Sequence, residues 1–162
     1  MPKIHLSMGS NIDRETHISS ALRELGELFG ELAISSVYET LAVGFEGPPF
    51  FNLVVSFQSD EPLLELAKAL REIEIRHGRA QKCAKFTDRT LDLDILLYGD
   101  LIFKDDKFQI PRDDIMRYAF VLEPLAEIAP NERHPVTRER YLELWKEFDK
   151  SGLVQNVIEA FW

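Results

Sequence analysis

The sequence predicts an α+β fold in which two helices cover one face of an antiparallel or mixed sheet. Short segments alternate apolar and polar residues with the period of two that is typical of strands. Two longer segments repeat apolar residues at helical spacing. Between Lys3 and Tyr98 these segments follow the order strand, helix, strand, strand, helix, strand, which is the ferredoxin-like pattern. We expect a helical C-terminal addition after this core, and a single domain over residues 1–162.

The four core strands are expected from short runs rich in β-forming residues. The last is the clearest, because Leu91, Leu93 and Ile95 alternate with polar residues and fall on one face. The expected strands span residues 3–8, 32–38, 52–58 and 91–98.

The two core helices each have an apolar stripe and a candidate cap. Apolar positions from Ile18 to Phe29 follow helical spacing. We expect the carboxylate of Asp13 to cap this helix by accepting N–H groups of its first turn. The second helix has its stripe between Leu63 and Ile73, with Asp60 or a neighbour as the cap.

The region after the fourth strand is predicted to be mixed in structure. A charged turn at residues 104–107 suggests a short hairpin within residues 101–110, and a polar connection follows. Apolar spacing predicts helices over residues 118–128 and 141–148. Residues 154–161 fit either a last strand or a helical tail.

Composition and charge exclude several classes of protein. No apolar run is long enough to span a membrane. The N-terminal residues lack the apolar segment of a secretion signal, and the single cysteine, Cys83, allows no internal disulfide, so we expect a cytoplasmic protein. The net charge of −9 argues against a nucleic-acid partner. Cations are nevertheless concentrated between Arg76 and Arg89, which suggests that a small polyanion binds before the fourth strand.

Asp92 and Asp94 are the central candidate residues. Both project from the same face of the fourth strand, where neighbouring like charges repel unless a cation lies beside them. Two carboxylates on a rigid strand suit a hard cation such as Mg²⁺. The alternative is a solvated edge strand with two surface acids.

Three further features are open between a structural and a functional role. The segment Leu41–Phe51 has three phenylalanines, which either pack inward or line an apolar site. Asn52 follows it and either bonds local backbone or faces a ligand. Glu74 opposes the dipole at the end of its helix, which a function or a nearby cation (Arg76 or Lys82) would explain.

Several motifs occur in one order along most of the chain. The most specific is Arg89-Thr90-Leu91-Asp92-Leu93-Asp94-Ile95. The others are Met8-Gly9-Ser10-Asn11, Tyr38-Glu39-Thr40, Phe51-Asn52-Leu53, Gly78-Arg79 and Phe120-Val121-Leu122-Glu123-Pro124-Leu125. Together they resemble the 6-hydroxymethyl-7,8-dihydropterin pyrophosphokinase family of folate biosynthesis. The resemblance implies a ferredoxin-like, usually monomeric enzyme that transfers pyrophosphate from ATP to the hydroxymethyl group of the pterin, giving AMP.

The resemblance also implies roles for individual residues. Asp92 and Asp94 would hold two Mg²⁺ ions, and Arg79 and Arg89 would bind the triphosphate. The nucleotide would also contact Glu74, Lys82, Ile95 and Arg112. The pterin would be bound by Thr40, Leu41, Val43, Phe50, Asn52 and Phe120, with the two phenylalanine rings on either side of it.

Two departures from the family's pattern lie on the nucleotide side. Arg112 stands where the family usually has a histidine, and Tyr118 stands where it has an arginine. They leave open a divergent relative that binds pterin or nucleotide with weak or no transfer, and a purely structural module is the third alternative. We also expect residues 41–51 and 78–89 to act as lids that order on ligand binding and exclude water.

Overall fold

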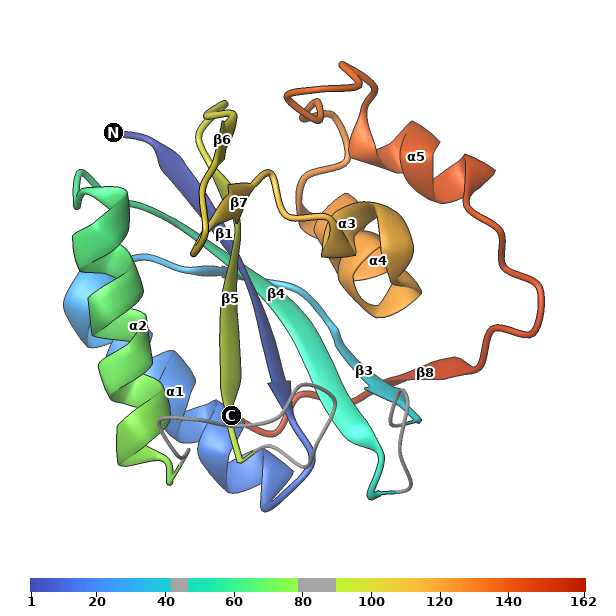
Figure 1. Cartoon of the computed structure of the whole chain (residues 1–162). Helices are drawn as coiled ribbons and strands as arrows, with labels where there is room; N and C mark the ends of the chain where they lie inside the picture. Colours follow the sequence, from blue (N-terminus) through green and yellow to red (C-terminus); the bar gives the residue numbers. More distant parts are fainter. Residues whose placement is uncertain (42–46, 79–89) are drawn as a thin grey trace.

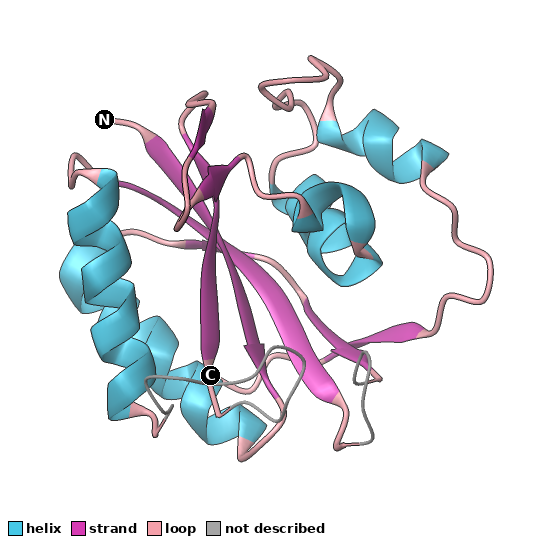
Figure 2. Cartoon of the chain, in the orientation of Figure 1, coloured by secondary structure: helices cyan, strands magenta, loops and turns pink. Residues whose placement is uncertain are grey.

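The computed structural model of the chain describes residues 1–41, 47–78 and 90–162. Its main sheet contains β1 (Lys3–Ser10), β2 (Ala33–Ile34), β3 (Val37–Thr40), β4 (Phe50–Gln58), β5 (Asp92–Tyr98) and β8 (Gln155–Ile158). The strands lie in the order β5-β1-β4-β3-β8, and the short β2 also pairs with β4 (Figures 1 and 2). All of these pairs are antiparallel.

Helices cover both faces of this sheet (Figure 1). On one face, α1 (Arg14–Phe29) and α2 (Leu63–Arg76) pack against alternate strand residues such as Leu53 and Leu93. On the other face, α4 (Ala119–Ile128) packs against Val54 and Leu96. The remaining elements are α3 (Asp114–Arg117), α5 (Tyr141–Glu147) and a hairpin of β6 (Phe103–Lys104) and β7 (Gln109–Ile110).

The predicted α+β class is confirmed, and the sheet is antiparallel. The predicted second strand is divided into β2 and β3, because the hydroxyl of Ser35 accepts the N–H of Val54 (2.9 Å) where the strand is interrupted. The addition after the core is not only helical, since β8 returns to the edge of the sheet beside β3. No helix in the described ranges is long and apolar enough to cross a membrane.

Both predicted helix caps are wrong. Asp13 precedes α1 with a φ of 47°, in the left-handed region, and its side chain makes no capping hydrogen bond. Asp and Asn adopt this region more readily than most residues, so the residue type suits the turn and not the cap. In α2 the N-cap position belongs to Pro62, which again has no capping side-chain bond.

Candidate active site

One row of paired residues crosses the sheet and brings candidate residues together. Asn52 of β4 pairs with Gly9 of β1, and Gly9 pairs with Asp92 of β5. Directly opposite residues on neighbouring strands project from the same face. Asn52 and Asp92 therefore lie on one face with the glycine between them, two strand spacings or roughly 10 Å apart. Asp94 shares this face, because side chains alternate along a strand.

Gly9 keeps the space between these side chains open. A Cβ atom at this position would lie 3.1 Å from Asn52 Oδ1 and 3.7 Å from Cδ1 of Phe50. The first distance is tighter than most real Cβ contacts, so a larger residue would push on the amide. The sequence predicted that the first strand ends at residue 8 and gave Gly9 no role in the site, whereas β1 continues to Ser10. A glycine within a strand often marks the close approach of another group.

The expected pterin-binding residues of β3 and β4 are neighbours in the structure. The amide nitrogen of Asn52 donates a hydrogen bond to Oγ1 of Thr40 (2.7 Å), and both residues are buried. Thr40 pairs with Phe50 across the two strands. Asn52 is thus bonded to a side chain and not to local backbone, and its carbonyl oxygen faces Gly9.

Phe50 and Phe51, the two described phenylalanines of the 41–51 segment, divide between the two predicted roles, and Phe45 lies outside the described residues. Phe51 is buried in the core on the α1 and α2 side, whereas Phe50 belongs to the face of Asn52. Phe120 lies in the first turn of α4, which packs against β3 and β4, and its ring stacks on that of Tyr118 at 4.9 Å. Leu41 follows β3 with 68% of its surface exposed.

The carboxylate pair is electrostatically strained. Burial, and then the charge of Asp92, raise the pKa of Asp94 to about 7, and the guanidinium of Arg112 opposes this rise. The Asp94 side chain is 26% exposed, and its Oδ1 lies 3.7 Å from an Arg112 nitrogen. A divalent cation at this place would favour the charged form of both acids.

The carboxylates of Asp92 and Asp94 fit a Mg²⁺ ion that also has water and substrate ligands. Within residues 1–41, 47–78 and 90–162, no group of three or more His, Cys, Asp or Glu side chains could hold a metal ion alone. Mg²⁺ is commonly held by one or two carboxylates, with water and substrate phosphates as its other ligands. Asp92 and Asp94 match that pattern, because they are a same-face carboxylate pair beside a cavity.

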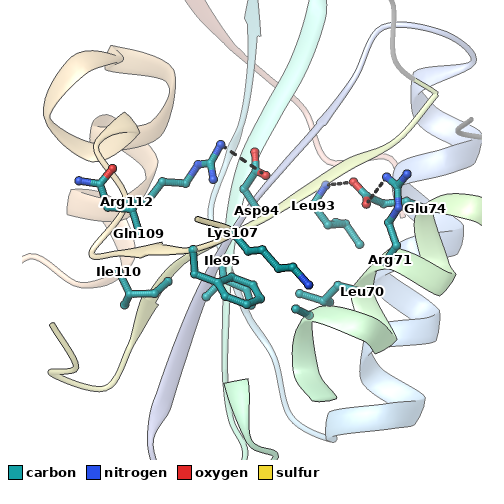
Figure 3. A pocket seen from close by; sticks show the side chains of 12 residues that line it. Leu70, Arg71, Glu74, Leu93, Asp94, Ile95, Lys107, Gln109, Ile110 and Arg112 are labelled. Carbon is teal, nitrogen blue, oxygen red and sulfur yellow. Dashed lines mark hydrogen bonds and ion pairs between the residues drawn. The ribbon is translucent and has the colours of Figure 1, made fainter. Parts of the chain in front are cut away.

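The cavity has a volume of about 180 Å³ and lies along the outer edge of β5, between α2 and residues 107–112 (Figure 3). Glu74, Asp94, Ile95 and Arg112 line it, together with cations such as Arg71 and Lys107. Three predicted nucleotide-binding residues and one of the acids therefore share one cavity. Arg112 is held there by ion pairs to Asp94 and to Asp114, the latter at 3.2 Å.

Glu74 has a structural partner that sequence reasoning did not foresee. Glu74 is 4% exposed, and its carboxylate accepts the backbone N–H of Leu93 at 2.9 Å. Figure 3 marks this hydrogen bond with a dashed line. Because β5 is an edge strand, this N–H points away from β1 and needs a partner outside the sheet. Glu74 therefore holds β5 at Leu93, the residue between Asp92 and Asp94. Arg76, which was one of the two cations expected to pair with Glu74, pairs with Glu24 instead.

Some predictions fall outside the described residues. These are the site roles of Val43, Arg79, Lys82 and Arg89, together with residues 42–46 of the first expected lid and residues 79–89 of the second.

The site thus combines a carboxylate pair with an amide and aromatic group on one side and a cation-lined cavity on the other. A family model for 7,8-dihydro-6-hydroxymethylpterin-pyrophosphokinase (HPPK) matches residues 5–130. The chain belongs to this family.

Relatives and solved structures agree with this membership. A protein of Aquifex aeolicus, named 2-amino-4-hydroxy-6-hydroxymethyldihydropteridine pyrophosphokinase, is 34% identical over 140 residues, which are 85% of this chain and 87% of the relative. A Bacillus subtilis protein of the same name is 32% identical and covers 94% of this chain and 95% of its own length. The crystal structure of a Plasmodium falciparum HPPK-DHPS triple mutant matches with a TM-score of 0.74 over 90% of this chain at 14% identity. This chain spans only 41% of that protein, and the likeness supports the fold alone.

Proposed function

We propose that the chain transfers a pyrophosphoryl group from ATP to the hydroxymethyl oxygen of 6-hydroxymethyl-7,8-dihydropterin, releasing AMP, as a step of folate biosynthesis. The family and the names of its relatives support this. Within the structure, the supporting observation is the row from Asn52 through Gly9 to Asp92. The amide of Asn52 could bind a flat heterocycle, and the carboxylate of Asp92 could bind a cation that also binds phosphate. The two groups lie on one face, at a separation that a small molecule could span.

The pterin would bind over Gly9. Because the amide nitrogen of Asn52 is engaged by Thr40, its carbonyl oxygen is directed to the open side, where it can accept an N–H of the ring. Phe50 would offer one aromatic face to the ring and Phe120 the other. Backbone groups at Leu41 and Val43 would complete the pocket. A site built from such hydrogen bonds rejects rings that leave them unmade.

The nucleotide would occupy the cavity beside β5, with its phosphates toward the aspartate pair. Asp92 and Asp94 would hold two Mg²⁺ ions, which when bound neutralise phosphate charge and polarise the attacked phosphorus. Glu74 keeps the strand of these acids in place, and Ile95 lines the cavity. Arg112, Arg79, Lys82 and Arg89 would bind phosphate oxygens.

The transfer itself is one displacement. The hydroxymethyl oxygen forms a bond to the β-phosphorus of ATP and loses its proton, while the bond from that phosphorus to the oxygen of the α-phosphate breaks and AMP leaves. Positioning and charge neutralisation supply most of the acceleration in such reactions. The side chains described above bind, orient and neutralise.

We also propose the finer architecture and setting. The order β5-β1-β4-β3, with α1 and α2 on one face, supports a ferredoxin-like class with β8 added at the edge. We treat residues 1–162 as one domain that acts as a monomer in the cytoplasm on small-molecule substrates, without nucleic-acid or membrane partners.

The test is AMP formation from ATP, Mg²⁺ and the hydroxymethylpterin. The matched control is 6-methyl-7,8-dihydropterin, which lacks the attacking hydroxyl and should give no AMP. Absence of AMP with the first compound, or equal AMP with both, would contradict the proposal. The divergent alternative would give pterin binding without AMP. Arg112 and Tyr118 suggested this alternative, and neither the family match nor the names of the relatives favour it.

A further inference from the structure

We infer that the C-terminal segment 155–161 positions the pterin-binding side of the site, with Gln155 and Phe161 as its positioning residues. The inference rests on the proposed function. The segment lies beyond residues 5–130, which the family model matches. It touches each of the three elements that carry the expected pterin-binding residues, namely β3, α4 and β4.

The first contact is with β3. The strand β8 pairs antiparallel with it, and Gln155 is directly opposite Thr40. Since β3 lies between β4 and β8, its backbone on the outer side is paired with β8. Thr40 in turn holds the amide of Asn52. The C-terminal strand β8 therefore holds β3 in place. The orientation of the Asn52 amide depends on β3 through Thr40.

The second contact is with the first turn of α4. The side-chain amide of Gln155 donates to the carbonyl oxygen of Ala119 (3.3 Å) and to a carboxylate oxygen of Glu123 (2.6 Å). These two groups flank Phe120 in the sequence. The other end of α4 is held separately, because Glu127 accepts hydrogen bonds from Ser36 and from Tyr38. Gln155 thus controls the end of the helix that carries Phe120.

The third contact is with β4. The ring of Phe161 stacks on that of Phe51 at 5.6 Å, and the guanidinium of Arg14 lies 3.6 Å from the centre of the same Phe51 ring. Arg14 also pairs with Glu39 of β3 at 2.8 Å and donates to the carbonyl of Pro49 at 3.1 Å. Because Phe51 lies between Phe50 and Asn52, holding its ring on the core side keeps these two neighbours on the site face.

These contacts predict an effect on one substrate only. The nucleotide-side cavity is built from α2, β5 and residues 107–112. The segment 155–161 is anchored to β3 and β4, which lie on the opposite side of β1 from β5. Loosening it should therefore disturb pterin binding and leave nucleotide binding unchanged.

The experiment uses Gln155→Ala and Phe161→Ala in the full chain. Calorimetry measures the Kd of a non-hydrolysable ATP analogue with Mg²⁺, and then the Kd of 6-hydroxymethyl-7,8-dihydropterin in the presence of that analogue. We expect the pterin Kd to rise about tenfold in Gln155→Ala, which is the worth of one good hydrogen bond, and by roughly a few-fold in Phe161→Ala, because the ring of Phe51 loses its stacking partner. The nucleotide Kd should change less than about twofold in both variants. The matched control is Asn156→Ala, whose side chain is exposed on the same strand.

Rescue separates positioning from general destabilisation. In Gln155→Glu a second carboxylate faces Glu123, and adding Glu123→Gln restores an amide–carboxylate pair with the roles exchanged. Pterin affinity should fall in the single variant and recover in part in the double, which restores the contact between residues 155 and 123 and leaves the carbonyl of Ala119 without its donor. Unchanged pterin affinity in Gln155→Ala and Phe161→Ala, or an equal loss for both ligands, would overturn the inference. A wild-type chain that binds no pterin would instead overturn the proposed function, and the inference with it.

Discussion

Replacing Gly9 with alanine tests the geometry of the site most sharply, because it adds a single methyl group. That methyl would lie 3.1 Å from the carbonyl oxygen of Asn52, which must then shift by a few tenths of an ångström. The amide cannot shift freely, since its nitrogen is bonded to Thr40 at 2.7 Å. We therefore expect that either this hydrogen bond or the proposed bond from Asn52 to the pterin is weakened.

The expected loss is that of one hydrogen bond, about 1 to 1.5 kcal/mol. This corresponds to a rise of roughly five- to twelvefold in the KM for the pterin. The KM for ATP should remain unchanged, because the cavity that we propose for the nucleotide lies on the far side of β5. The assay is steady-state AMP formation with each substrate varied in turn, accompanied by thermal unfolding of both proteins.

Gly26→Ala is the matched control. Gly26 lies within α1, and a Cβ there would meet nothing within 4 Å. Alanine is favoured over glycine inside a helix by about 0.5–1 kcal/mol, so this variant should unfold at a slightly higher temperature with unaltered kinetics. The reasoning is refuted if Gly9→Ala leaves the pterin KM at its wild-type value, or if the KM values of both substrates rise together.

Two further predictions concern stability. Glu74→Leu leaves the N–H of Leu93 without its carboxylate partner and should lower the free energy of unfolding by about 1–3 kcal/mol in urea titration. Glu74→Gln keeps an acceptor oxygen, so its free energy of unfolding should fall by less. Equal losses in the two variants would contradict this role of Glu74. The second prediction concerns pH: the hydrogen bond from His5, aided by Lys3, lowers the pKa of Glu132 from 4.5 to about 2. Because the folded-state pKa is the lower one, this stabilisation is complete above pH 4.5 and is lost as the pH falls toward 2. Glu132→Gln should flatten the unfolding temperature across that window, and a slope as steep as that of the wild type would count against it.

Much of the fold could be predicted because it follows from local periodicity. The alternation of Leu91, Leu93 and Ile95 predicted both the strand and its buried face, and the apolar spacing predicted α1 and α2. The last strand was harder, because β8 is only four residues long and its exposed Val157 carries no clear pattern. Its structure depends on the open edge of β3, which is a tertiary feature.

The site was predicted unevenly for the same reason. Asp92 and Asp94 are adjacent on one strand, so their shared face follows from the period of two. The place of Gly9 between Asn52 and Asp92 depends on the register of three strands that are far apart in the sequence. The bond from Glu74 to Leu93 depends likewise on α2 lying beside the edge of β5. Neither relation is encoded in any local pattern.

The central claim is that the Asp92 and Asp94 carboxylates anchor divalent ions for the transfer. It is tested most directly by the Mg²⁺ dependence of AMP formation in a single turnover, compared between the wild type and Asp94→Asn. Asparagine matches the shape of aspartate and removes the repulsion with Asp92, so the variant should fold normally. We expect its rate at saturating substrates to fall by about a hundredfold or more, in line with the loss of electrostatic stabilisation of a transition state. A rate within a few-fold of the wild type, with the same Mg²⁺ dependence, would contradict the account.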